Sequence, residues 1–393
     1  MREIIIAGAG TGSITPEVQE ALLRADVICA SERFTSLIPE GRRYIPLKHI
    51  DESLTQIAHE SGRVMILVSG DPGLYSLLPL VKRRFPDELI TVLPGISSIQ
   101  ALCARVGESW SDAVILSGHG RNLNAGRFLN LVERNRLVIL FCDKTHSPQW
   151  ACERLSGISG VDVVIGENLG SESELVLSGL PADFVNHDSP ELSLMLVRNS
   201  SPYVPDNLHP RDSEFVRAEG VVMTNESVRA VILGRLDVRR ESVFWDIGAG
   251  TGSISVCVGL ERPECEVHSV EYKPDAVRVI AMNAAKFHLH NIAVHEGRAL
   301  DVIYELPVPS HVFIGGSEGE LAGILEHIAR LDTSVHVVAA CVTLETFSTA
   351  YTLMKGLRDF EAVQVSVNEA KYLTPSSTLM KPKCPVVILL CNM

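Results

Sequence analysis

Three features that mark particular classes of protein are missing from this sequence. Its nine cysteines include no Cys-x-x-Cys pair, and most lie in apolar runs, where a reduced cysteine behaves as a small hydrophobic residue. We therefore predict neither disulfides nor a bound metal. No apolar run approaches the length that spans a bilayer, and no apolar leader precedes the first strand pattern. We expect a cytoplasmic enzyme.

Positive charge is also scarce. Lysines and arginines total 35 against 48 aspartates and glutamates, which gives a formal net charge of -13 and a pI near 5.5. Nonspecific binding of nucleic acid or of an anionic membrane requires a positive field, so we expect neither partner. If the substrate is an anion, lysines and arginines must be concentrated around it.

What the chain does contain is a regular alternation of strand and helix patterns, which is typical of α/β folds. Its 393 residues exceed what one hydrophobic core usually serves, so we expect two domains. In the first half, Thr15 and Pro16 predict the start of a helix that runs to Arg24. The strands predicted there are Glu3–Ala7, Val27–Ala30, Val64–Ser69, Ile90–Leu93, Ala113–Ser117 and Leu137–Cys142.

A proline-rich segment, 199–212, predicts a linker that can also form part of the second site. After it, Thr224 is predicted to cap a helix that reaches about Leu236. Seven strands follow, the last two as a hairpin-like pair, and this order favours the sheet of an S-adenosylmethionine (SAM)-dependent methyltransferase over a two-halved dinucleotide fold. They are Val243–Ile247, Glu266–Glu271, Ile292–Glu296, His311–Ile314, Val335–Ala340, Ala362–Val367 and Val386–Cys391.

The hexapeptide Gly-Ala-Gly-Thr-Gly-Ser occurs twice, at Gly8–Ser13 and at Gly248–Ser253, each time after a predicted strand. Glycines allow positive backbone dihedrals and let main-chain amides approach a ligand, toward which the next helix directs its N-terminus. Neither copy has the third glycine of the dinucleotide pattern. Asp246 precedes the second copy and gives the Asp-x-Gly-x-Gly-x-Gly pattern expected beneath the carboxypropyl group of SAM, whereas Ile6 takes that place in the first.

Further residues extend the second pattern. Glu271 ends the next strand, 19 residues beyond Gly252, where an acid can accept hydrogen bonds from both ribose hydroxyls. For an isolated acid the alternative is a carboxylate favoured by a helix N-terminus. Arg298 and Ala299 follow the third strand, where such enzymes contact adenine. The predicted cofactor site of the second half comprises Thr224, Asp246, Gly248, Ala249, Gly250, Thr251, Gly252, Glu271, Arg298 and Ala299.

Four segments of the second half carry a specific resemblance: Val204 through Arg211, Met223 through Ala230, Trp245 through Gly248 and Phe313 through Ser317. They resemble the decarboxylating corrinoid methyltransferase domain of cobalamin biosynthesis, and the similarity covers nearly all of residues 201 to 393. The family commonly has lysine at Asn225 and aspartate at His311, so a role of that lysine does not carry over. Within these segments we assign Asp206, Arg211, Arg229, Gly315 and Gly316 to a substrate site, and we add Lys381 because an anionic substrate requires basic residues.

In the first half, Glu32 lies twenty residues after the glycine loop and would by itself suggest a dinucleotide site. Two loops contradict this, because Ser69–Tyr75 (SGDPGLY) and Pro94–Ala101 (PGISSIQA) resemble the signature loops of the tetrapyrrole methylase family. Ser117–Arg121 and Glu167–Gly170 resemble the subgroup that methylates carbon 5 of a precorrin ring. In that family SAM lies between two α/β lobes. The resemblance implies contacts of SAM with Gly70, Asp71, Gly73, Tyr75, Ser97 and Ser98, and places Gly8, Gly10 and Gly12 toward the tetrapyrrole.

Together the resemblances imply a two-lobed class III tetrapyrrole methylase fold over residues 1–200 and a Rossmann-like class I SAM methyltransferase domain with a seven-stranded mixed sheet over 201–393. They imply one SAM per domain and precorrin-6B, or its cobalt-bearing counterpart, as substrate. The first domain would methylate carbon 5. The second would methylate carbon 15 and decarboxylate a ring acetate, giving precorrin-8. We also expect a homo-oligomer.

The substrate of such enzymes carries many carboxylates, which arginine can bind with two hydrogen bonds at once. We predict that some of six basic residues border the second pocket: Arg211, Arg217, Arg229, Lys371, Lys381 and Lys383. Solvated surface charge is the alternative for each. Two other functions stay open, an NAD(P)-dependent oxidoreductase suggested by the paired glycine loops and a non-enzymatic SAM-sensing or scaffold protein.

Overall fold

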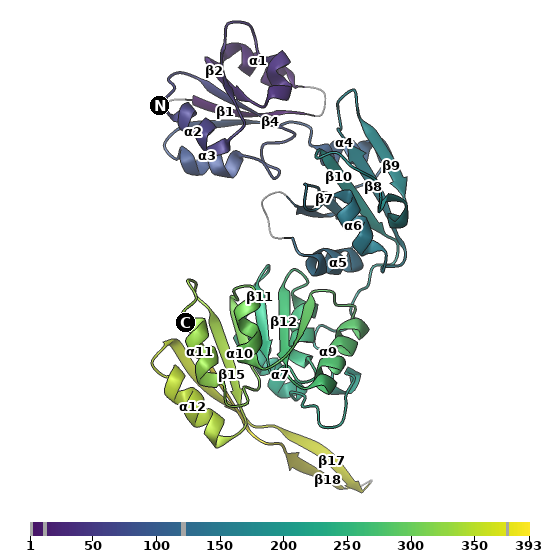
Figure 1. Ribbon diagram of the computed structural model, residues 1–393, viewed down its shortest axis with the longest axis vertical. Helices are drawn as coiled ribbons and strands as arrows, with labels where there is room; N and C mark the ends of the chain where they lie inside the picture. The colour runs from purple at the N-terminus through teal and green to yellow at the C-terminus, as the bar shows by residue number, and fades with distance from the viewer. Residues whose placement is uncertain (1–2, 11–13, 119–122, 375–376) are drawn as a thin grey trace. The chain divides into compact units, whose positions relative to one another are not determined.

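The structure is a computed structural model that describes residues 3–10, 14–118, 123–374 and 377–393 (Figure 1). Contacts between Cα atoms divide the chain into two compact units. The first comprises Met1–Leu123 and Asn135–Ser201, and the second comprises Asn124–Arg134 and Pro202–Met393. Gly12 lies outside the described residues, as do residues 119–121 of the Ser-Gly-His-Gly-Arg motif. Within the described ranges, no helix is long and apolar enough to cross a membrane.

The first unit begins with a five-stranded parallel sheet in the order β3-β2-β4-β1-β5. Its core lies on both faces, since Ile4 and Ile6 belong to one hydrophobic cluster and Ile5 to another, as expected for a covered parallel sheet. The predicted start of the first helix is confirmed, because the Val18 amide donates to Thr15 Oγ1 over 3.3 Å. The elements are β1 (Glu3–Ala9), α1 (Pro16–Arg24), β2 (Val27–Ala30), η1 (Glu32–Leu37), β3 (Arg43–Pro46), α2 (Ile50–Ala58), β4 (Val64–Ser69), α3 (Leu78–Arg84) and β5 (Leu89–Leu93).

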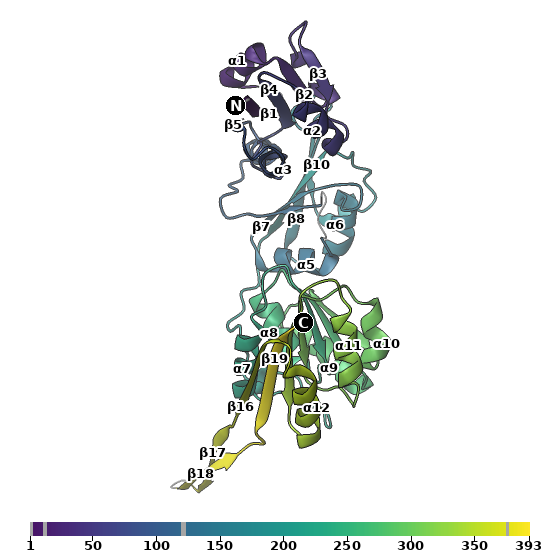
Figure 2. The same ribbon diagram turned by 90° about the vertical axis from the view of Figure 1, so that its left-hand side faces the viewer.

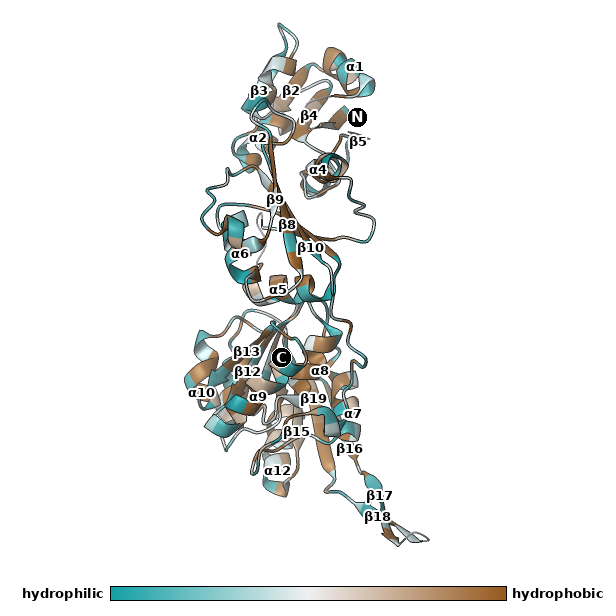
Figure 3. Ribbon diagram, turned by 90° about the vertical axis from the view of Figure 1, so that its right-hand side faces the viewer, coloured by the Kyte–Doolittle hydropathy of each residue, from teal (hydrophilic) through white to brown (hydrophobic). Residues whose placement is uncertain are grey.

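A second five-stranded sheet of the same unit has the order β6-β7-β10-β8-β9. Only β6 and β7 are parallel, and the other neighbours are antiparallel. Figure 3 shows hydrophobic residues following these strands, and Ile139 and Val164 pack with Leu102 in one buried cluster. The elements are α4 (Ser98–Val106), β6 (Val114–Ser117), β7 (Leu137–Phe141), α6 (Pro148–Leu155), β8 (Val161–Glu167), β9 (Leu175–Gly179), η2 (Pro181–Phe184) and β10 (Ser193–Asn199).

The second unit is built on a seven-stranded mixed sheet in the order β13-β12-β11-β14-β15-β19-β16. The strands from β13 to β15 are parallel, and β19 runs antiparallel to both of its neighbours. Adjacent Phe244 and Trp245 are both fully buried, one in the hydrophobic cluster on each face. The strands are β11 (Val243–Ile247), β12 (Glu266–Glu271), β13 (Ile292–Glu296), β14 (His311–Ile314), β15 (His336–Cys341), β16 (Arg358–Val365) and β19 (Val386–Asn392). The prediction of an α/β fold with mixed sheets is confirmed.

Helices cover this sheet, and a hairpin extends beyond it. The hairpin is formed by β17 (Asn368–Thr374) and β18 (Ser377–Pro382), which pair only with each other and project away from the sheet (Figures 1 and 2). The residues described in the two strands are all exposed. The helices are η3 (Asp212–Glu214), α7 (Glu226–Leu236), α8 (Ser253–Glu261), α9 (Pro274–Lys286), α10 (Ala299–Val302), η4 (Ile303–Glu305), α11 (Leu321–Ala329) and α12 (Leu344–Met354).

Helix α5 (Ala125–Arg134) belongs to the second compact unit although its sequence lies among the strands of the first. The Asn130 side chain is fully buried and donates to Pro263 O over 3.1 Å. Arg134 Nη1 donates to Leu260 O over 2.8 Å. A Cβ on Gly126 would overlap the carbonyl oxygen of His290, so this glycine permits direct contact between backbones. Residues 124–134 are therefore part of the second unit.

The start of α7 differs from the prediction, which was wrong by one residue. Asn225, not Thr224, is the N-cap, since its side chain accepts from the Ser227 amide over 3.0 Å. Asparagine is among the best N-cap residues and threonine is weaker. The asparagine that replaces the family's usual lysine thus has a structural role here. The carbonyl oxygen of Thr224 accepts instead from Arg229.

Candidate functional site

The second glycine loop joins the end of β11 to α8 at the carboxyl edge of the parallel strands. Gly248, Gly250 and Gly252 all have positive φ, between 57° and 74°. A Cβ on Gly248 would overlap the carbonyl oxygen of Gly316 and lie 2.6 Å from its nitrogen, and a Cβ on Gly250 would overlap Val222 O. Two other segments therefore pass directly against this loop, and only glycine permits such contacts between backbones.

The main-chain amides of the loop are bonded within the protein. Gly248 and Ala249 both donate to Val270 O, over 2.9 and 3.2 Å, and Thr251 donates to Val222 O over 3.1 Å. Gly250 donates to Glu271 Oε2 over 2.9 Å. Our expectation that the glycines free these amides for a ligand is thus wrong for these four, because their hydrogen bonds hold the loop itself in shape.

Glu271 ends β12 and is 6 % exposed. Its Oε1 accepts from the amides of Tyr272 and Lys273, each over 3.0 Å, while Oε2 holds the amide of Gly250. A carboxylate oxygen has two acceptor positions, so Oε2 keeps one for a hydroxyl group. Glu271 therefore fixes the glycine loop and also presents an acceptor to the pocket beside it.

Asp246 lies beneath the loop and is 1 % exposed. Its Oδ2 accepts from the Ser255 amide over 3.1 Å and from Ser255 Oγ over 2.5 Å, which fixes the first turn of α8. Burial raises the pKa of Asp246 to about 6. Among the residues that the structure describes, neither Asp246 Oδ1 nor Thr251 Oγ1 has a hydrogen-bond partner. Neither residue lines the pocket beside the loop, so both act on it from within the protein.

A pocket opens next to this loop at the ends of β11, β12 and β14. Of the predicted cofactor residues, Gly248, Glu271, Arg298 and Ala299 line it, as does Gly316, which we had assigned to the substrate. The other predicted residues of the loop, Ala249, Gly250, Thr251 and Gly252, do not line it. Gly315 is exposed, and its amide donates to Ile247 O over 2.8 Å.

Sequence reasoning missed several lining residues, namely Tyr272, Ser317, Glu318 and Glu320. Tyr272 Oη donates to Glu318 Oε1 over 3.2 Å, and Arg298 Nε donates to Glu320 Oε1 over 2.6 Å. The side chain of Arg298 thus holds the loop after β14. The signal that could have found these residues is their position directly after predicted parallel strands, whose carboxyl ends share one edge.

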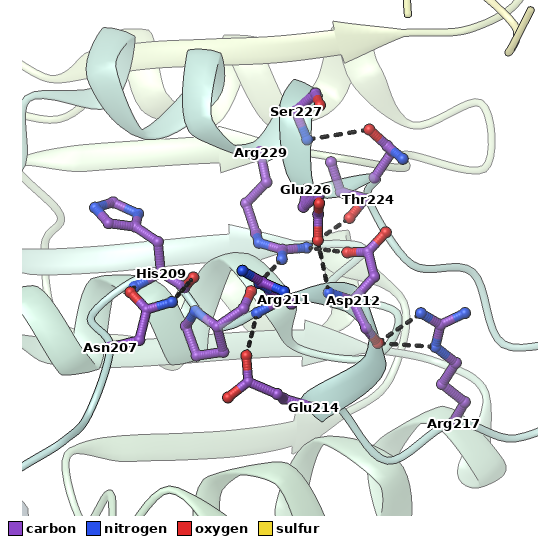
Figure 4. A network of polar contacts seen from close by, with 12 residues as sticks. Asn207, His209, Arg211, Asp212, Glu214, Arg217, Thr224, Glu226, Ser227 and Arg229 are labelled. Atoms are coloured by element: carbon purple, nitrogen blue, oxygen red, sulfur yellow. Dashed lines mark hydrogen bonds and ion pairs between the residues drawn. The ribbon is translucent and has the colours of Figure 1, made fainter. Parts of the chain in front are cut away.

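The last residues of the predicted linker (199–212) and those that follow form a strap in the second unit, which we define as residues 210–225 (Figure 4). Arg229 of α7 is 2 % exposed and donates to Pro210 O and Thr224 O, each over 2.7 Å, and to Asp212 Oδ1 over 3.0 Å. Its guanidinium also lies 4.9 Å from the centre of the Phe215 ring. The prediction that Arg229 binds a substrate carboxylate is wrong, because its donors are used in holding the strap.

Asn283 of α9 joins the strap to the glycine loop. This fully buried side chain accepts from the Val216 amide over 2.8 Å and donates to Thr251 O over 2.9 Å. The Val222 carbonyl, which accepts from Thr251, completes the connection. The strap, α7 and α9 therefore determine together where the glycine loop lies.

The other predicted basic residues also lie away from the pocket. None of the six lines it, so the prediction that some of them border it is wrong for this pocket. Arg217 donates to Asp212 O over 3.2 Å, and Lys383 pairs with Glu369 over 3.0 Å. Arg211 and Asp206 are exposed on the linker segment, and Lys371 and Lys381 are exposed on the β17–β18 hairpin.

The first unit has a much larger cavity, of about 890 Å³, which residues of both its sheets line. It brings together six of the residues predicted from the two signature loops and the first glycine loop: Gly10, Gly70, Asp71, Tyr75, Ser97 and Ser98. Gly73 does not line it. Three loops that lie far apart in the sequence thus meet at one cavity.

Gly8 has a packing role instead of the predicted contact with substrate. Its Cβ would overlap the carbonyl oxygen of Gly70 and lie 2.7 Å from Gly95 Cα, and Gly8 does not line the cavity. Because three backbones meet at Gly8, the first glycine loop and both signature loops are held at a fixed spacing. The prediction for Gly8 is therefore corrected.

Several lining side chains also stabilise their own loops. Asp71 Oδ1 accepts from the Gly73 amide over 2.8 Å, and Ser97 caps α4 in a capping box with Gln100. Tyr75 has a φ of 47° and its hydroxyl donates to Ile115 O over 2.8 Å. A left-handed tyrosine is uncommon, and it persists where the surrounding structure requires it.

Comparison with known proteins matches two families to successive parts of the chain. Residues 3–184 match the model of the tetrapyrrole (corrin/porphyrin) methylases, and residues 215–392 match the precorrin methyltransferase domain. The chain is 28 % identical over 346 residues to a Sinorhizobium precorrin-6Y C(5,15)-methyltransferase (decarboxylating), covering 86 % of this chain and 83 % of the relative. It is 37 % identical over 172 residues to a probable cobalt-precorrin-6B C(15)-methyltransferase (decarboxylating) of Pyrobaculum calidifontis, covering 43 % of this chain and 85 % of the relative.

Among solved structures, a precorrin-6Y C5,15-methyltransferase from Geobacter metallireducens is 31 % identical, with a TM-score of 0.42. The alignment covers 46 % of this chain and 94 % of that one. The two matched domains together define a tetrapyrrole methyltransferase. More specifically, the chain belongs to the decarboxylating precorrin-6Y C(5,15)-methyltransferase family.

Proposed function

We propose that the protein methylates precorrin-6B at carbons 5 and 15 and decarboxylates a ring acetate, with SAM as methyl donor and precorrin-8 as product. Residues 1–200, as a two-lobed class III domain, would carry out the first methylation. Residues 201–393, as a Rossmann-like class I domain, would carry out the second together with the decarboxylation. The cobalt-bearing counterpart of the substrate suits the same sites, since any metal would belong to the substrate.

The observation that carries this proposal is the pocket of the second unit, where the glycine loop at Gly248 and the strand-end acid Glu271 meet. The one free acceptor position of Glu271 Oε2 suits a ribose hydroxyl. Asp246 does not line the pocket and supports it from beneath, by fixing the first turn of α8. The contact of Gly248 with Gly316 leaves no side chain between two loops that would flank the cofactor. We propose one SAM in this unit and another in the cavity of the first, on the Gly70–Tyr75 and Ser97–Ser98 loops.

The chemistry requires little from protein side chains. Bound SAM would supply an electrophilic methyl group, and the enamine-like carbons of a reduced tetrapyrrole are already nucleophilic. Holding the carbon and the methyl group in line therefore accounts for most of the rate enhancement. During decarboxylation the macrocycle accepts the electron pair, so the residues of the pocket orient the acetate and exclude water.

Mass spectrometry of precorrin-6B incubated with SAM and the full chain tests the proposal. We expect a product that has gained two methyl groups and lost one carbon dioxide. Glu271→Gln should stop after one methyl group without loss of carbon dioxide, because only the second site is affected. Glu296→Gln is the matched control, since Glu296 pairs with Glu271 in the register of β12 and β13, is exposed and does not line the pocket. Unchanged precorrin-6B, or stabilisation by NAD(P) and not by SAM, would refute the proposal.

We further propose that the protein forms homo-oligomers, in which the β17–β18 hairpin packs against a second copy of the chain. Four large apolar residues are exposed there: Tyr372 (78 %), Leu373 (60 %), Leu379 (48 %) and Met380 (58 %). An isolated two-stranded hairpin is at best marginally stable in water, so pairing with another copy would stabilise it. Sedimentation equilibrium of the wild type and of a Tyr372→Ser, Met380→Ser variant tests this. A wild-type monomer would contradict it.

A further inference from the structure

Two basic side chains line the large cavity of the first unit. Arg33 belongs to η1, which follows β2, and Lys48 comes shortly after β3. Neither residue belongs to the glycine loop or to the two signature loops. The cavity beside them is also lined by apolar side chains, among them Phe34, Leu37 and Leu74. Apolar side chains and two cations thus line the same cavity.

The acids that line the same cavity are engaged with other groups. Asp71 accepts from the amide of Gly73 over 2.8 Å, and Glu191 lies 3.7 Å from the ammonium of Lys144. Lys48 pairs with Glu32 over 2.6 Å, but both side chains are at least 60 % exposed. Exposed ion pairs are worth little, so an anionic ligand can compete for Lys48.

Arg33 has the stronger requirement for an anion. In the described part of the chain it forms no ion pair, and its guanidinium lies 4.8 Å from the centre of the Phe34 ring. The side chain is exposed overall, yet nearby protein atoms remove part of its hydration and lower the pKa of Arg33. A guanidinium that has lost water without gaining a carboxylate is stabilised by a ligand that brings one.

We propose that Arg33 and Lys48 bind ring carboxylates of the tetrapyrrole in the first unit, an assignment that rests on the proposed function. The macrocycle would lie against the apolar lining while its carboxylates meet the two cations. Arginine suits this position because its planar fork matches a carboxylate and its face stacks on an aromatic ring. The local positive charge expected for an anionic substrate therefore lies in the first unit.

Steady-state kinetics of carbon 5 methylation by the full chain tests the assignment. Arg33→Gln and Lys48→Gln should each raise the KM for the precorrin about tenfold, the effect of losing one charge-assisted hydrogen bond, and leave the KM for SAM unchanged. The second unit provides an internal control, since loss of carbon dioxide from a substrate already methylated at carbon 5 should keep its wild-type rate. Matched surface controls are Arg42→Gln and Lys82→Gln, because neither residue lines the cavity.

A binding measurement separates failure of this assignment from failure of the proposed function. Uroporphyrin, a polycarboxylated macrocycle, is titrated into the wild type and the variants at low and high salt. We expect weaker binding by Arg33→Gln and a smaller dependence on salt. A precorrin KM that is unchanged in both variants overturns the assignment while leaving the function intact. Equal affinity of wild type and variants for uroporphyrin also overturns the assignment. If the wild type does not methylate carbon 5, the proposed function itself fails.

Discussion

Two glycines that touch each other in the second unit are predicted to differ sharply in their tolerance of alanine. A Cβ on Gly248 would overlap Gly316 O and lie 2.6 and 2.8 Å from the nitrogen and Cα of that residue. A Cβ on Gly316 would meet nothing closer than 4.0 Å. The two positions therefore differ: the Gly316 backbone occupies the space that a Cβ on Gly248 would need, whereas the space for a Cβ on Gly316 is open.

The magnitude follows from two terms. Gly248 has a φ of 71°, and the left-handed conformation costs a residue with a Cβ about 1 to 2 kcal/mol. Displacing the Gly316 backbone to relieve the overlap adds about 1 to 3 kcal/mol, as for other overpacked sites. We expect Gly248→Ala to lower the free energy of unfolding by about 2 to 5 kcal/mol and Gly316→Ala to change it by less than about 1 kcal/mol.

Urea denaturation followed by tryptophan fluorescence measures these differences, since Trp245 is fully buried in β11 of this unit. Gly234→Ala is the matched control. It lies within α7, a Cβ added there would meet no atom within 4 Å, and the variant should be stabilised by about 0.5 to 1 kcal/mol through helix propensity. Equal stability of Gly248→Ala and Gly316→Ala would refute the packing argument.

Three further substitutions test the supports of the glycine loop. Asn225→Ala should lower the free energy of unfolding by about 1 kcal/mol through loss of the α7 cap, as measured by urea denaturation. Arg229→Met should cost about 3 kcal/mol, because the half-buried Asp212 and two carbonyls lose their donor, and calorimetry should show a lower Tm. Asp246 has a pKa raised to about 6 in the folded state from 3.8, so its charged form is disfavoured by folding. Stability should therefore fall as pH rises from about 4 to 6, by on the order of 3 kcal/mol, and this part of the pH dependence should be absent in Asp246→Asn.

The strands that the sequence predicted correctly are those with continuous apolar runs between helices. β3 and β9 were missed because short edge strands with exposed residues carry little apolar signal. β8 and β10 contain buried apolar runs, so they could have been predicted from the same signal as the others. A run of apolar residues thus predicts a central strand, whereas an edge strand depends on pairing with the rest of the sheet.

The same distinction, between local sequence pattern and contacts made by the rest of the fold, applies to the candidate site. Glu271 could be placed at the pocket from strand order alone, since parallel strands end at one edge of their sheet. The burial of Arg229 could not be predicted, because nothing in its own helix shows that the strap folds back over it. Glu318 and Glu320 could not be predicted to line the pocket either. They belong to the loop after β14, whose position is set by hydrogen bonds with Tyr272 and Arg298.

The membership of α5 in the second unit sets an order of events during synthesis. The chain passes from one unit to the other after Leu123, returns after Arg134 and leaves again after Ser201. Asn130 finds its partner at Pro263, 133 residues later. At typical translation rates that interval lasts roughly 7 to 27 seconds. During this time α5 lacks the surface on which it packs, because its partners Leu260 and Pro263 have not yet been synthesised.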